Sequence, residues 1–254
     1  MILKTAYKYQ LADYKKPIAI YYGIIAAIIS LVFFFGLSVR IFSGSTSTSS
    51  TLQIGAMDAT TAVFLFVMGL NSFRESFFML LQNGISRKTF FMTRFISSSV
   101  AAVIMAAIDN LLVLVGKGLF SVNEKLQIET LVEQLYNRGP NPPVLLQSFF
   151  RGTVFDFFMY LAVISLGFFI TIIFYRLNQT GKVLIAAGLP VTLFVILPMV
   201  IYAKPAIGTA LSKFLNLAFG ISTANPYAAM LTFAIITLLL SLASWPILRR
   251  AVVK

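Results

Sequence analysis

Residues Pro17–Val39 read PIAIYYGIIAAIISLVFFFGLSV, a run without any charged residue that is followed directly by Arg40. A helix needs about 20 consecutive apolar residues to cross a hydrocarbon core of roughly 30 Å, and this run is long enough. It is too long for the core of a secretory signal, and no convincing small-x-small cleavage site ends it. The run therefore predicts a first transmembrane helix that the protein retains.

Five further runs of comparable length follow. The hydrophobic class makes up 59% of the 254 residues and charged residues only 11%, whereas soluble domains contain about 25% charged residues. The sequence thus predicts an all-α polytopic membrane protein, a single transmembrane domain over residues 1–254 with six transmembrane helices. The predicted spans are residues 17–39, 55–81, 90–115, 153–175, 183–202 and 227–248.

The chain contains no cysteine and no histidine. Their absence excludes disulfides, thiolate or imidazole metal sites, and Ser-His or Cys-His nucleophile pairs. No phosphate-binding loop is present either, since Gly181-Lys182 is followed by Val183 and lacks the upstream glycine of such a loop. We therefore expect no catalytic residue, no metal site and no cofactor in this chain.

The basic residues are distributed unevenly between the two sides of the predicted bundle. The net charge of +12 would suggest nucleic acid in a soluble protein, but in a membrane protein it marks short cytoplasmic loops. Both termini are therefore predicted to be cytoplasmic. Basic residues on the termini's side are Lys4, Lys8, Lys15, Lys16, Arg87, Lys88, Arg176, Lys182, Arg249, Arg250 and Lys254, and those on the other side are Arg40, Lys117, Lys125, Arg138, Lys204 and Lys213.

Residues 2–16, which precede the first span, form an amphipathic stretch that Pro17 is expected to end. Leu3, Tyr7, Leu11 and Tyr14 recur at helical spacing, with lysines elsewhere on the helical wheel. This pattern predicts an interfacial helix on the cytoplasmic leaflet. The alternative is a basic tail that only anchors the topology.

Two predicted outer segments also have helical patterns. Ser121 and Glu124 are spaced as a capping box before an apolar stripe that contains Ile128, Leu131, Val132 and Leu135, which predicts a short outer helix. Residues 204–226 carry an apolar helical stripe too short to span a membrane. This second segment predicts a re-entrant or interfacial helix between the last two spans.

The loop between the second and third spans is short and polar, with the sequence Asn83-Gly84-Ile85-Ser86-Arg87-Lys88-Thr89. Gly84 is suited to a turn after the second helix, and Ser86 is suited to cap the third. Such a loop favours contact with a soluble partner. A plain positive-inside hairpin is the alternative.

Charged residues within predicted spans are candidates for function by default. Arg74 and Glu75 lie about two turns from the cytoplasmic end of the second span, and Asp109 lies deeper in the third. We expect Asp109 to pair with a neighbouring helix, with a role in ion translocation as the alternative. Asp58 and Asp156, near the outer ends of their helices, are expected to face headgroups and water.

The stretch from Arg74 to Phe91, RESFFMLLQNGISRKTFF, resembles a segment of the type 2 ABC exporter permeases (the ABC-2 family). Gram-positive bacterial members have a Gly-x-Ser/Thr-Arg-Lys turn and a Phe pair at the inner end of the second helix, and Arg94 lies where many have a basic residue. The proline that the family often has in this turn is absent. The order of an interfacial helix, six spans and a re-entrant segment resembles the family over nearly the whole chain.

The resemblance implies a permease subunit in a bacterial plasma membrane, whose loop from Asn83 to Thr89 docks on a separate ATPase. Two ATPase copies would bind ATP and Mg, and two permease subunits, alike or different, would enclose the pathway. Amphipathic or hydrophobic peptides, such as toxins or antimicrobials, are the implied substrates. The alternatives are an ion-coupled secondary transporter using Asp109 or Glu75, a carboxylate-based membrane enzyme, and a scaffold or sensor.

Overall fold

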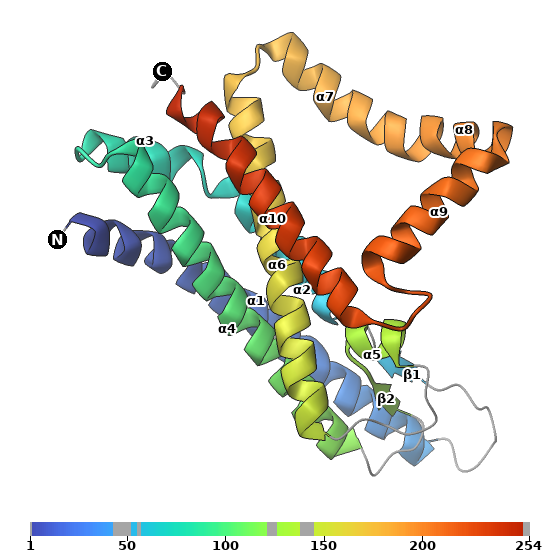
Figure 1. Ribbon diagram of the computed structural model, residues 1–254. Coiled ribbons are helices and arrows are strands. Elements are labelled where there is room, and N and C mark those ends of the chain that lie inside the picture. Colours follow the sequence, from blue (N-terminus) through green and yellow to red (C-terminus); the bar gives the residue numbers. More distant parts are fainter. Residues whose placement is uncertain (1, 43–51, 55–56, 121–125, 138–144, 251–254) are drawn as a thin grey trace.

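The computed structural model describes residues 2–42, 52–54, 57–120, 126–137 and 145–250 (Figure 1). This part of the chain is helical except for turns and two strands of three residues each, which confirms the predicted all-α class. In chain order the helices are α1 (Ile2–Phe42), α2 (Met57–Asn71), α3 (Arg74–Gln82), α4 (Arg87–Phe120), α5 (Leu131–Tyr136), α6 (Leu145–Arg176), α7 (Gln179–Val191), the π-helical turn η1 (Thr192–Ile196), α8 (Leu197–Ala203), α9 (Pro205–Phe219) and α10 (Pro226–Arg249).

Four helices in the described ranges are long and apolar enough to cross a membrane. They comprise Ala6–Leu31 within α1, Arg87–Gly118 within α4, and the whole of α6 and α10. Two bent pairs would raise the number to six if each pair is one span. The first joins α2 to α3 at a bend of 42°, and the second joins Phe194–Ala203 to α9 at a bend of 115°. The chain therefore has four to six helices of membrane-spanning character.

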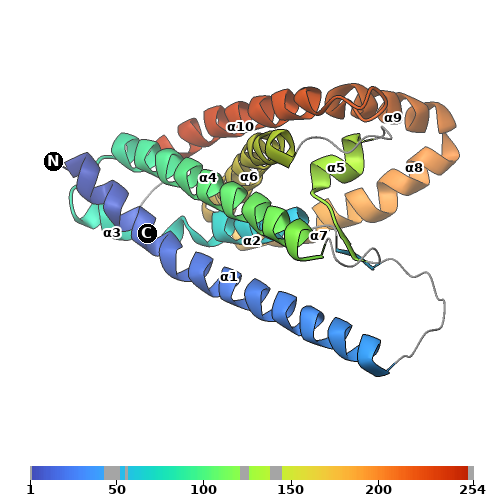
Figure 2. The same ribbon diagram turned by 90° about the horizontal axis from the view of Figure 1, so that it is seen from below.

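Helix α6 is the centre of the bundle, and α2, α4 and α10 all pack against it (Figure 2). Helix α1 packs on α4, whereas α7 and α8 extend away from the bundle and α9 returns from them to the start of α10 (Figure 1). Both chain termini lie toward the end of the bundle that carries α3, and α5 lies toward the opposite end (Figure 1). We name these the inner end and the outer end, following the predicted orientation.

Two glycines bring the backbones of α2 and α6 into direct contact. A Cβ atom on Gly69 would lie 2.6 Å from the carbonyl oxygen of Ile164, and one on Gly167 would lie 2.5 Å from that of Phe66. The Thr171 hydroxyl of α6 also donates a hydrogen bond to the carbonyl oxygen of Leu70, at 2.8 Å. Small residues at helix contacts are typical of membrane bundles, where close backbone approach gives the packing energy.

Helix α1 continues through Pro17 without a break, although we expected that proline to end an interfacial helix at residue 16. A proline removes one hydrogen bond from a helix and tends to kink it, but membrane helices tolerate this loss. Residues 2–16 are therefore helical as expected, and they belong to the same helix as the apolar run.

The segment predicted to be re-entrant forms the bend between α8 and α9. Lys204 has an extended backbone (φ −134°, ψ 85°), as the residue before a proline prefers, and Pro205 starts α9. Gly220 ends α9 in the left-handed conformation, with φ of 61°. The Tyr136 hydroxyl then donates to the carbonyl oxygen of Phe219 at 2.6 Å, which fastens the end of α9 to α5.

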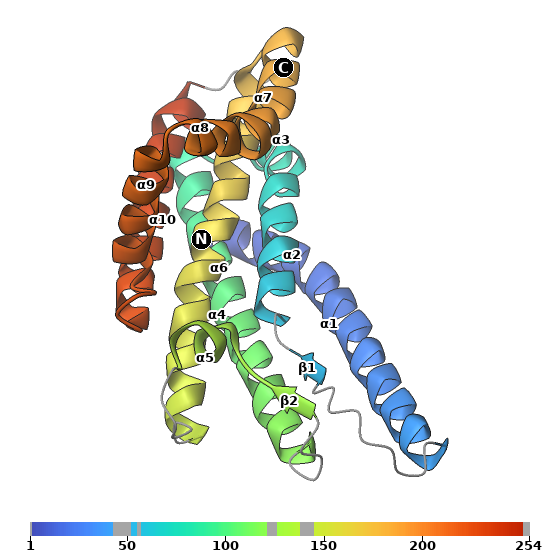
Figure 3. The ribbon, with the colours of Figure 1, turned by 90° about the vertical axis from the view of Figure 1, so that its right-hand side faces the viewer.

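At the outer end, β1 (Leu52–Ile54) and β2 (Leu126–Ile128) pair in parallel near α2 and α5 (Figure 3). Both strands have the sequence Leu-Gln-Ile, and like residues face each other in register. The expected outer helix is present, but its position was wrong. Ile128 belongs to β2, the observed capping box is Thr130 with Glu133, and the residues 121–124 that we expected to form the box lie outside the described ranges.

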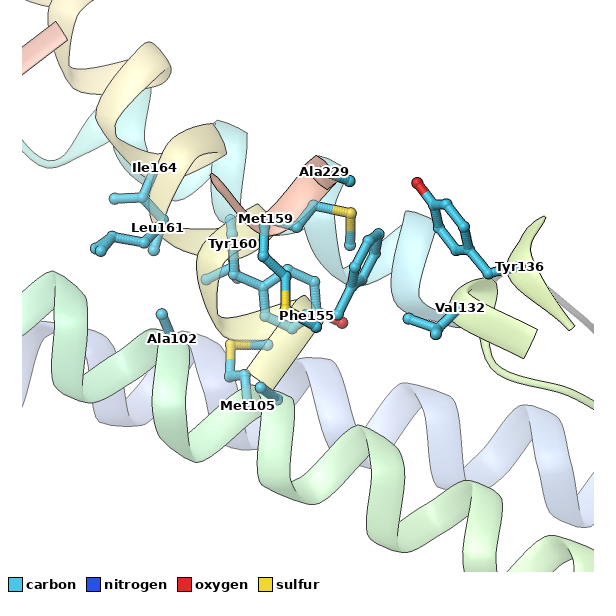
Figure 4. Packing of buried hydrophobic residues seen from close by; sticks show 13 residues of the cluster. Ala102, Met105, Val132, Tyr136, Phe155, Met159, Tyr160, Leu161, Ile164 and Ala229 are labelled. Atoms are coloured by element: carbon cyan, nitrogen blue, oxygen red, sulfur yellow. The ribbon is translucent and has the colours of Figure 1, made fainter. Parts of the chain in front are cut away.

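The outer half of the bundle has an apolar core between α2, α4, α6 and α10, with α5 covering it (Figure 4). Tyr160 of α6 is fully buried at its centre, beside Met105 of α4 and Leu65 of α2. Its members are Leu65, Ala102, Met105, Ala106, Val132, Tyr136, Phe155, Met159, Tyr160, Leu161, Ile164, Ala229 and Met230. This core holds in place the polar groups described below.

We predict that Gly167→Ala destabilises the bundle by about 1–3 kcal/mol, because its methyl group would force α2 away from α6. The matched control is Gly188→Ala in α7, where an added Cβ meets no atom within 4 Å. The control should be neutral or slightly stabilising, since alanine is the better helix former. Denaturation of the purified protein in mixed micelles measures both effects, and equal stability of the two variants would contradict the close α2–α6 contact.

Candidate functional site

The predicted loop from Asn83 to Thr89 forms a tight turn between α3 and α4. Gly84 has a φ of 74°, a conformation that residues with a side chain rarely adopt. Its amide donates to the carbonyl oxygen of Leu81, and the amide of Ile85 donates to that of Leu80, each at 3.0 Å. These two bonds form a Schellman motif, which satisfies the last carbonyl groups of α3.

The start of α4 is capped by Ser86, as the sequence predicted. The Ser86 hydroxyl accepts a hydrogen bond from the Thr89 amide at 3.2 Å and lies 2.8 Å from the Thr89 hydroxyl. The Ser86 carbonyl also accepts from the Phe90 amide at 2.9 Å. Both helices that meet at the turn are therefore closed by local hydrogen bonds, which leaves the turn little freedom of its own.

Ile85 anchors the turn in a second apolar group, which we name the inner aromatic cluster. The Ile85 side chain is buried, and the rings of Phe73 and Phe77 stack with centroids 4.8 Å apart beneath it. The cluster draws on α1, α3, α4, α6 and α10. Its buried members are Ala6, Phe73, Phe77, Leu80, Ile85, Phe90, Phe168, Ile172 and Leu248.

The tip of the turn presents polar groups to the surroundings. Asn83, Gly84, Ser86 and Lys88 are exposed. Arg87 is half-buried and donates a hydrogen bond to the carbonyl oxygen of Arg249 at the end of α10. The loop is therefore an exposed polar tip on a buried apolar base, and it is fastened to the C-terminal helix.

The residues that we expected on the apolar face of an interfacial helix lie in α1 and differ in burial. Tyr7 and Leu11 are half-buried, and the Leu3 side chain lies outside the described part of the structure. Tyr14 is buried against α4, where its hydroxyl lies 3.2 Å from that of Ser98. Tyr14 therefore packs inside the bundle, although its spacing placed it with the membrane-facing residues.

Asp109 joins three helices. Its carboxylate accepts a hydrogen bond from the Tyr22 hydroxyl of α1 at 2.8 Å and from the Tyr160 hydroxyl of α6 at 2.6 Å. The side chain is only 1% exposed. Asp109 thus pairs with neighbouring helices through hydrogen bonds rather than through a cation. Of the other predicted charges, Glu75 is exposed on α3, and Arg74 begins α3 with its side chain outside the described part.

Asp58 and Asp156 do not face water as we expected, because both side chains are buried. Asp156 accepts a hydrogen bond from the Asn110 amide at 2.6 Å, which links α6 to α4. Asp58 accepts from the backbone amide of Leu131 at 2.6 Å, at the start of α5. Position in the predicted spans suggested exposure, but α5 folds over Asp58, and α6 begins at Leu145, so Asp156 lies inside that helix and faces Asn110 of α4.

An ion pair closes the outer end. Lys117 at the end of α4 lies 2.6 Å from the carboxylate of Glu133, which also accepts from the Ser148 hydroxyl at 3.0 Å. Burial opposes ionisation of Glu133, but the hydrogen bond from Lys117 and that from the Thr130 amide outweigh it and lower its pKa below the ordinary value. Lys117, Glu133 and Ser148 therefore fasten α5 to α4 and α6.

Arg94 was singled out from the sequence only through the family resemblance, and its burial was not predicted. Within the described ranges no carboxylate is hydrogen-bonded to its charged side chain. Its position inside the predicted third span, which begins at residue 90, was a signal that it could be buried. Asn110, next to Asp109, was a similar signal. Which helix each would face could not be read from one chain.

The described residues contain no cluster of carboxylates that could hold a metal ion. Searches with the whole chain find no matching protein family, no matching curated protein and no matching solved structure.

We predict that Tyr160→Phe destabilises the protein by about 1–3 kcal/mol, because it leaves an oxygen of buried Asp109 without its donor. In the Asp109→Asn background the same change should cost less, and this coupling is measured by a double-mutant cycle in mixed micelles. The control is Tyr202→Phe, since Tyr202 is 90% exposed and should be neutral. Additive losses from the two mutations would contradict a direct Asp109–Tyr160 contact.

Proposed function

We propose that this chain is the membrane-spanning permease subunit of an ATP-driven exporter of the type 2 ABC class. In this proposal α1, the α2–α3 pair, α4, α6, the helical stretch from α7 to α8, and α10 are the six spans. The first residues of α1 lie along the cytoplasmic leaflet, and the bend at Lys204 makes α9 the re-entrant segment. Both termini face the cytoplasm of a bacterium.

The observation that carries this proposal is the construction of the α3–α4 turn. Its tip is exposed and polar, its base is buried, and its two ends are closed by capping hydrogen bonds. The base shares the inner aromatic cluster with residues near the inner ends of α1, α6 and α10. A force on the tip would therefore be transmitted through α3 and α4 to three further helices at once, which is what a coupling element needs.

Energy for transport would come from a partner, because the sequence has no phosphate-binding loop. Two ATPase subunits, each binding ATP and Mg, would engage two permease subunits. Lys88 and the Arg87 backbone are available for such contact at the inner end. The second permease subunit is either an identical copy or a sister chain.

Peptides that are amphipathic or hydrophobic, such as toxins or antimicrobials, are the proposed substrates. This substrate class rests on the resemblance of the α3–α4 segment to Gram-positive peptide exporters and resistance permeases. The apolar surface of α7 to α9 supports it, since no residue in the described part of α8 or α9 is buried. Such a surface is compatible with a hydrophobic pathway for the substrate beside the lipid.

The alternative of an ion-coupled secondary transporter has less support. Both carboxylate oxygens of Asp109 already accept hydrogen bonds from tyrosines, and Glu75 is exposed near the inner end rather than in the bundle. Transport by the purified chain alone in liposomes, driven by an ion gradient, would establish this alternative.

The test is to purify the tagged chain from its native membrane with its partners and to measure ATP hydrolysis. We predict that Arg87→Glu/Lys88→Glu reduces the ATPase activity that co-purifies by at least about tenfold, because the charge reversal opposes docking of the tip. The matched control is Arg176→Glu/Lys182→Glu, which reverses two exposed charges in the other short inner turn, between α6 and α7.

Full activity with the control and loss with the α3–α4 variant would support the coupling role. Equal activity of the two double variants would assign no special role to the α3–α4 turn. Absence of any ATPase from the wild-type preparation would contradict the ABC assignment itself.

A further inference from the structure

Arg94 is a positive charge buried in the inner half of the bundle, with its side chain 4% exposed. Its guanidinium lies over the ring of Tyr14, 4.8 Å from the centroid, and 5.7 Å from the ring centroid of Phe168. It also donates a hydrogen bond to the Ser72 hydroxyl. These contacts come from α1, α6 and the break between α2 and α3, so the charge lies where several helices meet.

No carboxylate within the described ranges forms a hydrogen bond or an ion pair with Arg94. Asp13, one residue before Tyr14, acts on it only through space, because Asp13 is exposed and accepts a hydrogen bond from Ser76 at 3.1 Å. The Nε atom of Arg94 is buried and has no hydrogen-bond partner among these residues. A buried charge is costly unless an opposite charge compensates it, and two aromatic rings compensate it only in part.

Beside Arg94 is a groove with a free volume of about 20 Å³. It lies between α4 and α10, with α6 as its floor. Phe95 is exposed at its rim, and Phe91 and Ser241 are half-buried, so the groove reaches the surface of the bundle. The lining residues are Phe91, Arg94, Phe95, Ser98, Ile164, Ser165, Phe168, Ser241 and Ser244.

The chemistry of this lining is that of an anion site with apolar walls. The Arg94 guanidinium and the hydroxyls of Ser165 and Ser241 supply donors, and three phenylalanines surround them. The other two serine hydroxyls of the lining are engaged, since Ser244 donates to the carbonyl oxygen of Leu240 and Ser98 is hydrogen-bonded to Tyr14. The volume suffices for one or two atoms of the size of a phosphate oxygen and not for a whole headgroup, because about 10–15 Å³ of such space holds one water molecule. An occupant would therefore insert oxygens and leave the rest of its structure outside, in the bilayer.

The depth of Arg94 indicates which molecule carries these oxygens. Arg94 follows Arg87, the first residue of α4, by two turns, which places it about 10 Å along the helix from the inner surface. The polar layer of one leaflet is roughly 5–8 Å thick, so this depth is close to the boundary between headgroups and hydrocarbon. Phospholipid phosphates lie next to this boundary. The groove opens on the side of the bundle, toward the lipid at that depth.

We propose that the groove between α4 and α10 binds the phosphate of an anionic phospholipid from the inner leaflet, with Arg94 as its counter-ion. An anionic lipid fits better than a zwitterionic one because only the former adds the net negative charge that Arg94 lacks. The acyl chains would lie along exposed apolar residues of α4 and α10. The site is independent of the proposed transport function, since it depends only on Arg94, the serines and the membrane.

Trp245 makes the proposal directly measurable. It is the single tryptophan of the chain, and its ring lies 5.5 Å from that of Phe91, a lining residue of the groove. The purified, delipidated protein would be titrated in mixed micelles with dioleoylphosphatidylglycerol. Dioleoylphosphatidylcholine and inorganic phosphate would be titrated separately. Trp245 fluorescence and the midpoint of thermal unfolding, Tm, would be recorded at each step.

We expect a saturable fluorescence change and a rise in Tm of about 5 °C with phosphatidylglycerol, because a ligand that binds only the folded state stabilises it. Phosphatidylcholine and inorganic phosphate should each give much smaller effects. Arg94→Gln should abolish the response, and Arg94→Lys should retain part of it. The control Arg176→Gln removes an exposed arginine near the inner end and should respond as the wild type does.

A second variant keeps the proposal testable if Arg94→Gln does not fold. Ser241→Phe fills the groove and leaves Arg94 in place, so it should abolish the phosphatidylglycerol response. Leu242→Phe, on the neighbouring residue that is 70% exposed, should not. A response to phosphatidylcholine as large as that to phosphatidylglycerol would overturn the proposal, and so would an unchanged response of Ser241→Phe. An equally large response to inorganic phosphate would also overturn it and would assign the groove to a soluble anion instead.

Discussion

The bundle depends on one constraint: hydrocarbon cannot hydrogen-bond the polar side chains that the helices carry. Serine and threonine hydroxyls can bond to a carbonyl of their own helix, as Thr93 and Ser244 do. The buried carboxylates take their donors from other helices, and these partners determine which helices meet. Asp109 holds α1 and α6 against α4, and Asp156 with Asn110 connects α6 to α4 a second time. The α2–α6 contact instead uses the absence of side chains at Gly69 and Gly167. Helix α6 is the centre of the bundle because α2, α4 and α10 all pack on it, and only the bond from Tyr22 to Asp109 among these contacts bypasses it.

The two ends of the bundle are held together in different ways. At the inner end, side chains from five helices pack into one cluster under the α3–α4 turn, so the helix ends there are mechanically joined. At the outer end, α5 buries Val132 and Tyr136 in the outer core. Its Leu131 amide also donates to Asp58, and its Glu133 pairs with Lys117. The outer closure therefore combines apolar packing with an ion pair and hydrogen bonds between helices.

The sequence allowed good prediction where one helix is sufficient to explain a feature. Apolar runs predicted helices, and Gly84 and Ser86 predicted the turn between α3 and α4, because turn and cap chemistry is local. Features that depend on a second helix were missed or wrong. Asp58 and Asp156 seemed exposed from their position near helix ends, but burial depends on α5 folding over one and on Asn110 reaching the other. Tyr14 matched a membrane-facing stripe, yet it is buried in the bundle, where its ring contacts Arg94 and its hydroxyl contacts Ser98.

The positions of the buried charged residues indicate which helices would move together in a conformational change and which could move separately. Arg94, Asp109 and Asp156 all contact α6 or α4, so separating these two helices would expose charges to hydrocarbon at high cost. Helices α8 and α9 carry no buried residue in their described part. Near its C-terminal end, α9 is fastened to α10 and α5 by the carbonyls of Ala218 and Phe219 and by the Phe219 ring, which packs on Phe233. A conformational change in this chain would therefore keep α1, α4 and α6 as one body. The α7–α9 arm, which has no such charge to expose, is the part free to change its position.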